Sequence, residues 1–304
     1  MNHRTSSRIR RPGFRVFLLG ALVATQSLVA EPTGIVIEGA EVMSPGLSVK
    51  TWTTPGVLQY ANKPQQAARA KSKVFQIVIH ETTGATWQGI PDPNLGVQFH
   101  LDRDGTIVQH ADVVDMLWHA EACSAHSVGI ENVNLAFDHD DKANPGETDP
   151  GVRLPIKWSG STKGYYVVPP RAQLEALFDL VQTLKQELGV GDNWPQVMPH
   201  PDPAKREAQP DRTFFLMMTG GHRYFPASIA KEPVIISHSV LGGHADGAFH
   251  SLYLWLRLDR GKDADTAYQL ALQIAEDADH LRHTRHFEHK TNATLQLLDV
   301  SDLM

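Results

Sequence analysis

The sequence predicts an α/β protein in which a mixed, mainly central β-sheet is flanked by helices. Two short apolar runs, at residues 74–79 and 233–236, have the length and composition of buried strands. Between them, the leucines, phenylalanine and valine of residues 174–188 recur at helical spacing on one face. Strand and helix patterns thus occur in mixed order, which favours α/β or α+β over all-α or all-β.

The remaining elements follow from turn and breaker residues. Residues 97–109 alternate around Asp104-Gly105, a dipeptide typical of tight hairpins. Residues 127–133 predict another strand, and residues 138–164, rich in Asp, Gly, Pro, Lys and Ser, predict a loop. Pro169-Pro170 opens the helix of residues 174–188, and a last helix is expected from about Ala264 to Leu281.

Residues 1–30 have the pattern of a secretory signal peptide. Five arginines precede a short apolar run, and Ser27 to Ala30 supply small residues before the expected cleavage site. The apolar run is too short to span a bilayer comfortably, so we expect no stable membrane insertion after cleavage. The mature protein is expected to be exported, either periplasmic or secreted.

The other predicted segments are an extended lead-in at 31–68, one domain at 69–260 with an irregular insertion at about 189–232, and a helical extension at 261–304.

Composition excludes several functional classes. Removing residues 1–30 removes five arginines and no acidic residue, which takes the net charge from −6 to −11 and argues against nucleic-acid binding. The single cysteine, Cys123, excludes a disulfide scaffold and is interpreted as a structural thiol.

Two of the predicted buried strands lead directly into a histidine, His80 after residues 77–79 and His238 after residues 235–237. Strand ends are rigid and open at the sheet edge, where ligands bind. Asp246 follows His238 by eight residues, and two imidazoles with one carboxylate suit zinc. With 16 histidines in the chain, a surface or core position is the commoner explanation for any single one, and the pair at matching strand ends is the stronger candidate for a metal site.

Several motifs occur in an order that resembles the type 2 N-acetylmuramoyl-L-alanine amidases, relatives of the peptidoglycan recognition proteins. They are Ile77–Thr83, Asp102–Gln109, Trp118–Ala120, Ser127–Glu131 and His238–Phe249. The resemblance implies that residues 69–260 are a zinc amidase domain, with one zinc ion held by His80, His238 and Asp246. It also implies hydrolysis of the amide bond between N-acetylmuramic acid and L-alanine in peptidoglycan or muropeptides.

Glu131 matches the family position for general acid–base catalysis, because amide hydrolysis needs a base for water and a proton for the departing amine. The alternative is an exposed strand glutamate in a salt bridge. By the two-residue period of a strand, Gly129 lies on the same face as Glu131. We expect this glycine to leave room for a substrate backbone.

His244 stands where the family usually has a lysine, and it is a candidate catalytic residue and a rival third metal ligand. Trp118 and His119 are expected beside the site, in contact with the sugar or the stem peptide, or else as core residues. The histidines at 280, 283, 286 and 289 are interpreted as a solvated segment.

Two other functions remain open at this point: a peptidoglycan-binding module without catalysis, and an exported toxin that attacks cell walls. The presence of all three ligand positions favours the enzyme over the first.

Overall fold

The computed structural model describes residues 34–44, 46–57, 68–82, 96–134, 151–158, 161–190, 194, 232–240 and 247–277. The chain divides into two compact units, Met1–Glu31 and Pro32–Met304, and every described residue belongs to the second. The predicted signal peptide, most of the predicted insertion and the histidines at 280–289 therefore lie outside the described residues. In the described part, no helix is long and apolar enough to cross a membrane.

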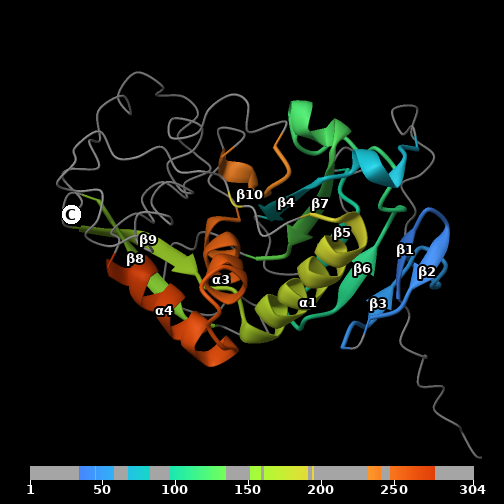
Figure 1. The fold of residues 1–304 in the computed structure, drawn as a ribbon. Coiled ribbons are helices and arrows are strands. Elements are labelled where there is room, and N and C mark those ends of the chain that lie inside the picture. Colours follow the sequence, from blue (N-terminus) through green and yellow to red (C-terminus); the bar gives the residue numbers. More distant parts are fainter. Residues whose placement is uncertain are drawn as a thin grey trace, which may run out of the picture. The chain divides into compact units, whose positions relative to one another are not determined.

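A six-stranded mixed sheet forms the centre of the described structure (Figure 1), with the strand order β10-β4-β7-β5-β6-β3. All neighbouring pairs are parallel except β5 and β6, which form the predicted antiparallel hairpin. The strands span Val49–Lys50 (β3), Gln76–Glu81 (β4), Phe99–Leu101 (β5), Ile107–Gln109 (β6), Ser127–Asn132 (β7) and Ile235–Ser237 (β10). The predicted mixed α/β class is confirmed.

In the described ranges, three helices accompany this sheet. They are α1 (Arg171–Leu188), α3 (Ala248–Leu258) and α4 (Ala264–Asp277), and short 3-10 turns cover Lys71–Lys73, Glu121–Ala125 and His238–Val240. The helix predicted from residues 174–188 is α1, and α4 begins at the predicted residue. The helix α3 was not expected from the sequence.

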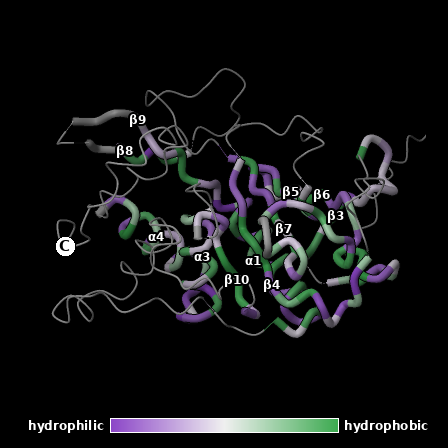
Figure 2. Tube along the Cα trace, turned by 90° about the horizontal axis from the view of Figure 1, so that it is seen from above, coloured by the Kyte–Doolittle hydropathy of each residue, from purple (hydrophilic) through white to green (hydrophobic). Residues whose placement is uncertain are grey.

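Helix α1 packs its apolar face on one side of the central strands (Figure 1). Leu177, Leu180 and Leu184 join Ile79 and Ile130 in a fully buried cluster. In Figure 2 the hydrophobic colour runs along the central strands, β10 for example. Burying a Leu or Ile side chain contributes about 1.5–3 kcal/mol each, so this layer is a main source of the stability that holds β4 and β7 side by side.

Among the residues that the structure describes, two small antiparallel pairs lie outside the central sheet. The strands β1 (Ile35–Ile37) and β2 (Ala40–Val42) form one pair, and β8 (Arg153–Trp158) and β9 (Ser161–Val167) form the other. The β8–β9 pair corrects the prediction of a loop through residue 164, because its backbone hydrogen bonds form despite a Lys-, Gly- and Pro-containing sequence. The predicted lead-in also contributes β3 to the main sheet.

Candidate active site

The register of the sheet places three polar residues in one row across β4, β7 and β5. His80 pairs with Glu131, and Glu131 pairs with His100 on its other side. Residues paired across neighbouring strands have side chains on the same face, so all three point away from the leucines of α1. Each is buried, with exposed fractions of 4% for His80, 6% for Glu131 and 1% for His100.

His238 completes this row at the edge strand. Strand β10 pairs with β4 so that Ser237 lies opposite Ile79, and His238 follows at the start of the next turn. The imidazole centroids of His80 and His238 are 4.4 Å apart, with an interplanar angle of 32°. The two histidines expected at neighbouring strand ends therefore do meet, although β4 continues one residue beyond His80.

Glu131 lies beside His80 at a distance that suits proton transfer through an intervening water. Its Oε2 atom is 4.0 Å from Nδ1 of His80, which is an ion-pair separation beyond direct hydrogen bonding. Strand β7, which carries Glu131, also holds the backbone of His80, because Asn132 Nδ2 donates a hydrogen bond to the His80 carbonyl at 2.8 Å. An exposed salt-bridge role for Glu131 does not fit its burial.

His119 contacts this group from the segment between β6 and β7. Its Nδ1 is 2.9 Å from Nε2 of His80, and its Nε2 is 3.0 Å from Oγ of Ser127. Desolvation lowers the pKa of His119 to about 3, and the neighbouring His238 and Arg69 shift it the same way, so the ring is neutral. Trp118, next to it, is 56% exposed, which contradicts the alternative of a core tryptophan.

The space above Gly129 is occupied by this histidine. A Cβ atom at Gly129 would lie 2.8–2.9 Å from three ring atoms of His119. The expectation that Gly129 leaves room for a substrate backbone is therefore wrong. The glycine instead lets the imidazole of His119 lie directly on β7, close enough to reach His80.

The sequence interpretation missed His100 and its neighbour His110. Their rings meet edge to face at a centroid distance of 4.8 Å. Burial lowers the pKa of His100 well below its usual range, and the neighbouring His110 lowers it further. A signal was available, since Gln98 and His100 alternate with apolar residues along the hairpin. Gln98 also bonds across the sheet, where its Oε1 accepts the Gly129 N–H at 2.8 Å.

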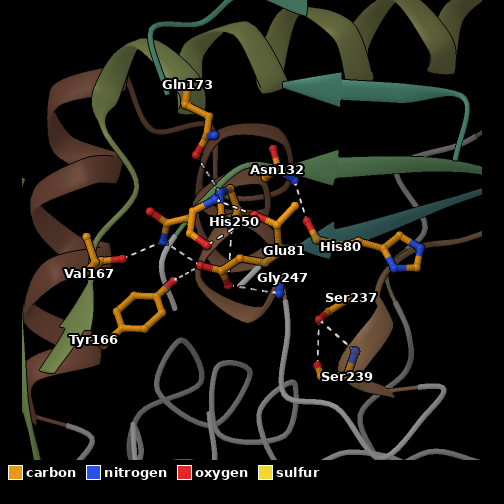
Figure 3. Close-up of polar contacts among 12 residues, drawn as sticks. His80, Glu81, Asn132, Tyr166, Val167, Gln173, Ser237, Ser239, Gly247 and His250 are labelled. Atoms are coloured by element: carbon orange, nitrogen blue, oxygen red, sulfur yellow. Dashed lines mark hydrogen bonds and ion pairs between the residues drawn. The ribbon is translucent and has the colours of Figure 1, made fainter. Parts of the chain in front are cut away.

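A second polar cluster lies on the opposite side of β4, around Glu81. Figure 3 shows the His80 ring pointing away from it. Oε1 of Glu81 accepts hydrogen bonds from Asn134 Nδ2 at 2.6 Å and Tyr166 Oη at 3.2 Å, and Oε2 accepts the Gly247 N–H at 3.3 Å. His250 approaches the same carboxylate at 4.0 Å.

Gly247 connects this cluster to the start of α3. Its φ is +74°, and a Cβ there would lie 2.4 Å from the carbonyl oxygen of Ile79. The backbone of Gly247 is therefore pressed against β4 one residue before His80. Asp246, the expected third ligand, directly precedes Gly247 in the chain, but Asp246 and His244 both lie outside the described residues.

The donor chemistry of the described residues fits a zinc ion in part. His80 and His238 supply two imidazoles, the commonest nitrogen ligands of zinc. Within the ranges that the structure describes, no group of three or more His, Cys, Asp or Glu side chains is arranged to hold a metal. A zinc site would need a third ligand from outside these ranges, and Asp246 remains the prediction for it.

Residues 70–212 match a family model described as N-acetylmuramoyl-L-alanine amidase. This range includes His80, Trp118, His119 and Glu131 and ends before His238. No curated protein matches the chain.

Solved structures show distant likenesses. The Clostridium intestinale endolysin amidase LysCS is 16% identical over 46% of this chain and 75% of its own, with a TM-score of 0.27. The Escherichia coli amidase AmiD is 15% identical over 68% of this chain and 99% of its own, with a TM-score of 0.28. Drosophila peptidoglycan recognition protein SA is 14% identical over 46% of this chain and 72% of its own, with a TM-score of 0.28.

Likenesses at these scores carry no argument about activity. The assignment rests on the matching family model, whose range contains the row of buried polar residues on β4 and β7. Over residues 70–212 the chain is therefore similar to the N-acetylmuramoyl-L-alanine amidase family.

Proposed function

We propose that this protein hydrolyses the amide bond between N-acetylmuramic acid and L-alanine in peptidoglycan or muropeptides, with one zinc ion as cofactor. The observation that carries the proposal is the adjacency of His80, His238 and Glu131 on one face of the sheet. Two imidazoles beside a buried carboxylate would supply two metal ligands and a proton acceptor, and His80 and Glu131 lie within the matched range of residues 70–212.

In this proposal His80 and His238 hold the zinc together with Asp246. Bound zinc would polarise the scissile carbonyl and activate water. Glu131 accepts a proton from the attacking water as the new C–O bond forms. The same carboxyl group then returns this proton to the amide nitrogen as the C–N bond breaks, so that the amine leaves neutral.

His119 and Trp118 have different parts in the proposal. Trp118 offers an exposed indole next to the row, where it would contact the sugar or the stem peptide. His119 is already engaged with His80 and Ser127 through both ring nitrogens. We therefore assign substrate contact to Trp118 and a supporting part to His119.

The test is mass spectrometry of products from purified peptidoglycan and from soluble muropeptides, with and without a chelator. Cleavage at the lactyl–alanine amide that stops with the chelator and returns with zinc is expected. Metal analysis of His80→Ala should show loss of zinc. Binding of peptidoglycan without any cleaved product would instead establish a non-catalytic binding module, and wild-type zinc content in His80→Ala would overturn the metal assignment.

Glu131→Gln separates chemistry from binding, because the amide keeps the shape of the side chain and removes the base. Turnover should fall by about 100- to 10,000-fold while zinc content and substrate affinity are retained. The matched control is Glu187→Gln on α1, a partly exposed glutamate paired with Lys71, which should leave turnover unchanged. A fall smaller than about tenfold with zinc retained would make Glu131 structural and His244 the next candidate.

A further inference from the structure

A continuous chain of hydrogen bonds leads from His80 to a backbone carbonyl. Nε2 of His80 is 2.9 Å from Nδ1 of His119, and Nε2 of His119 is 3.0 Å from Oγ of Ser127. Oγ of Ser127 is in turn 2.8 Å from the carbonyl oxygen of Cys123. Every link has an ordinary hydrogen-bond length. Both ring nitrogens of His119 and the hydroxyl group of Ser127 take part in the chain.

The carbonyl at the end of this chain sets the direction of every bond in it. A carbonyl oxygen only accepts, so the single hydroxyl proton of Ser127 points to Cys123. The Ser127 oxygen must then accept from Nε2–H of His119. A neutral imidazole has one N–H, so Nδ1 of His119 is an acceptor and takes the proton of His80 Nε2.

We propose that His119 is a positioning residue that holds His80 in its Nε2–H tautomer, so that Nδ1 of His80 is the nitrogen that binds metal. Nδ1 lies on the side of the ring nearer to Glu131, whose Oε2 is 4.0 Å away. Metal-bound histidines generally donate their second N–H to a fixed acceptor, which sets tautomer and ring orientation. The part of this inference that concerns metal rests on the proposed function.

His119 is itself fixed on three sides, as a positioning residue must be. Gly129 has no Cβ, which lets the ring lie against β7. Oγ of Ser124 accepts the backbone N–H groups of His119 and Ala120 at 3.1 and 2.8 Å. The ring nitrogens are held by His80 and Ser127, so the acceptor atom is presented to His80 with little freedom.

The direct test is the tautomer of each histidine in the metal-free full-length protein. Long-range nitrogen–proton NMR correlations of the imidazole rings distinguish Nε2–H from Nδ1–H. We expect Nε2–H for both His80 and His119. Observation of Nδ1–H on His80 would overturn the inference, whether or not the protein later proves to bind zinc.

The second test measures zinc affinity by competition with a chromophoric chelator. His119→Ala and Ser127→Ala should each bind zinc about 10- to 100-fold more weakly than the wild type. The control is His126→Ala, whose ring stacks on Phe75 at 4.8 Å next to the same segment, and it should bind zinc as the wild type does. Equal losses in all three variants would indicate general disruption of the segment and would contradict a specific part for His119.

The two proposals fail in different ways. A wild-type protein that binds no zinc refutes the proposed metal-dependent function and leaves the tautomer result to stand by itself. A wild-type protein that binds zinc tightly, with unchanged affinity in His119→Ala, refutes the positioning part and leaves the enzyme proposal intact.

Discussion

Replacing Glu81 with alanine is expected to cause one of the largest losses of stability of any single substitution in this protein. The Glu81 side chain is 1% exposed and accepts hydrogen bonds from Asn134, Tyr166 and Gly247. Each donor left buried without its acceptor costs about 1–3 kcal/mol. Three such donors together cost about 3–9 kcal/mol, and the one methylene group lost beyond Cβ adds about 0.8 kcal/mol, so we expect a total of about 4–10 kcal/mol.

Glu81→Gln should cost less, because it keeps both methylenes and one accepting oxygen. The new NH2 group must face a donor on one side, which predicts a loss of about 1–3 kcal/mol. The control Glu187→Ala removes a partly exposed ion pair with Lys71 and should cost less than about 1 kcal/mol.

The assay is urea unfolding followed by circular dichroism, with the free energy of unfolding extrapolated to water. The expected order of stability loss is Glu187→Ala, then Glu81→Gln, then Glu81→Ala. Since small domains have a total stability of about 5–15 kcal/mol, the alanine variant should be at or near the unfolding threshold. A loss below about 2 kcal/mol for Glu81→Ala would refute the reasoning that three buried donors depend on this carboxylate.

Three further outcomes are expected. Burial lowers the pKa of His250 to about 3 and that of His100 well below 6.5, so below pH 6.5 the unfolded chain binds protons that the folded protein does not. The free energy of unfolding should therefore decrease as the pH is lowered from about 6.5 towards 3, by up to about 1.4 kcal/mol per pH unit for each histidine. His250→Gln should flatten the dependence of the urea midpoint on pH. A wild-type midpoint that does not change with pH would contradict this. Gly247→Ala should lower the free energy of unfolding by more than about 2 kcal/mol, because its Cβ would meet the β4 backbone at 2.4 Å. Gly261→Ala, with a similar φ and nothing within 4 Å, should lower it by about 1 kcal/mol. Equal losses in the two variants would be inconsistent with the close approach at Gly247. N-terminal sequencing of protein from the native envelope fraction should begin near residue 31, and a retained Met1 in the cytosol would exclude export.

The two strands that lead into His80 and His238 were predictable because apolar residues dominate their sequences at strand length. This pattern located β4 and β10, and with them the meeting of the two histidines. Helix α3 was not predictable by periodicity. All nine residues from Ala248 to Leu256 are buried, so no polar stripe marks one face.

The contact between His80 and His119 depends on tertiary structure that local patterns do not contain. His119 follows β6 in a segment without helical or strand periodicity, and it reaches β4 only because the chain returns across Gly129 of β7. The same glycine was interpreted from the sequence as open space. A missing side chain signals close approach of another group, and the sequence alone does not say which group approaches.

The alternation of His80 and Glu81 on β4 makes this strand intolerant of insertion or deletion. A shift of one residue would turn the imidazole toward α1 and the carboxylate toward the face that carries Glu131 and His100. Either error alone would separate a buried ionisable group from its hydrogen-bond partners, and here a single slip produces both. Length variation in this protein should therefore be confined to the connections around β4, while the strand itself keeps a fixed number of residues.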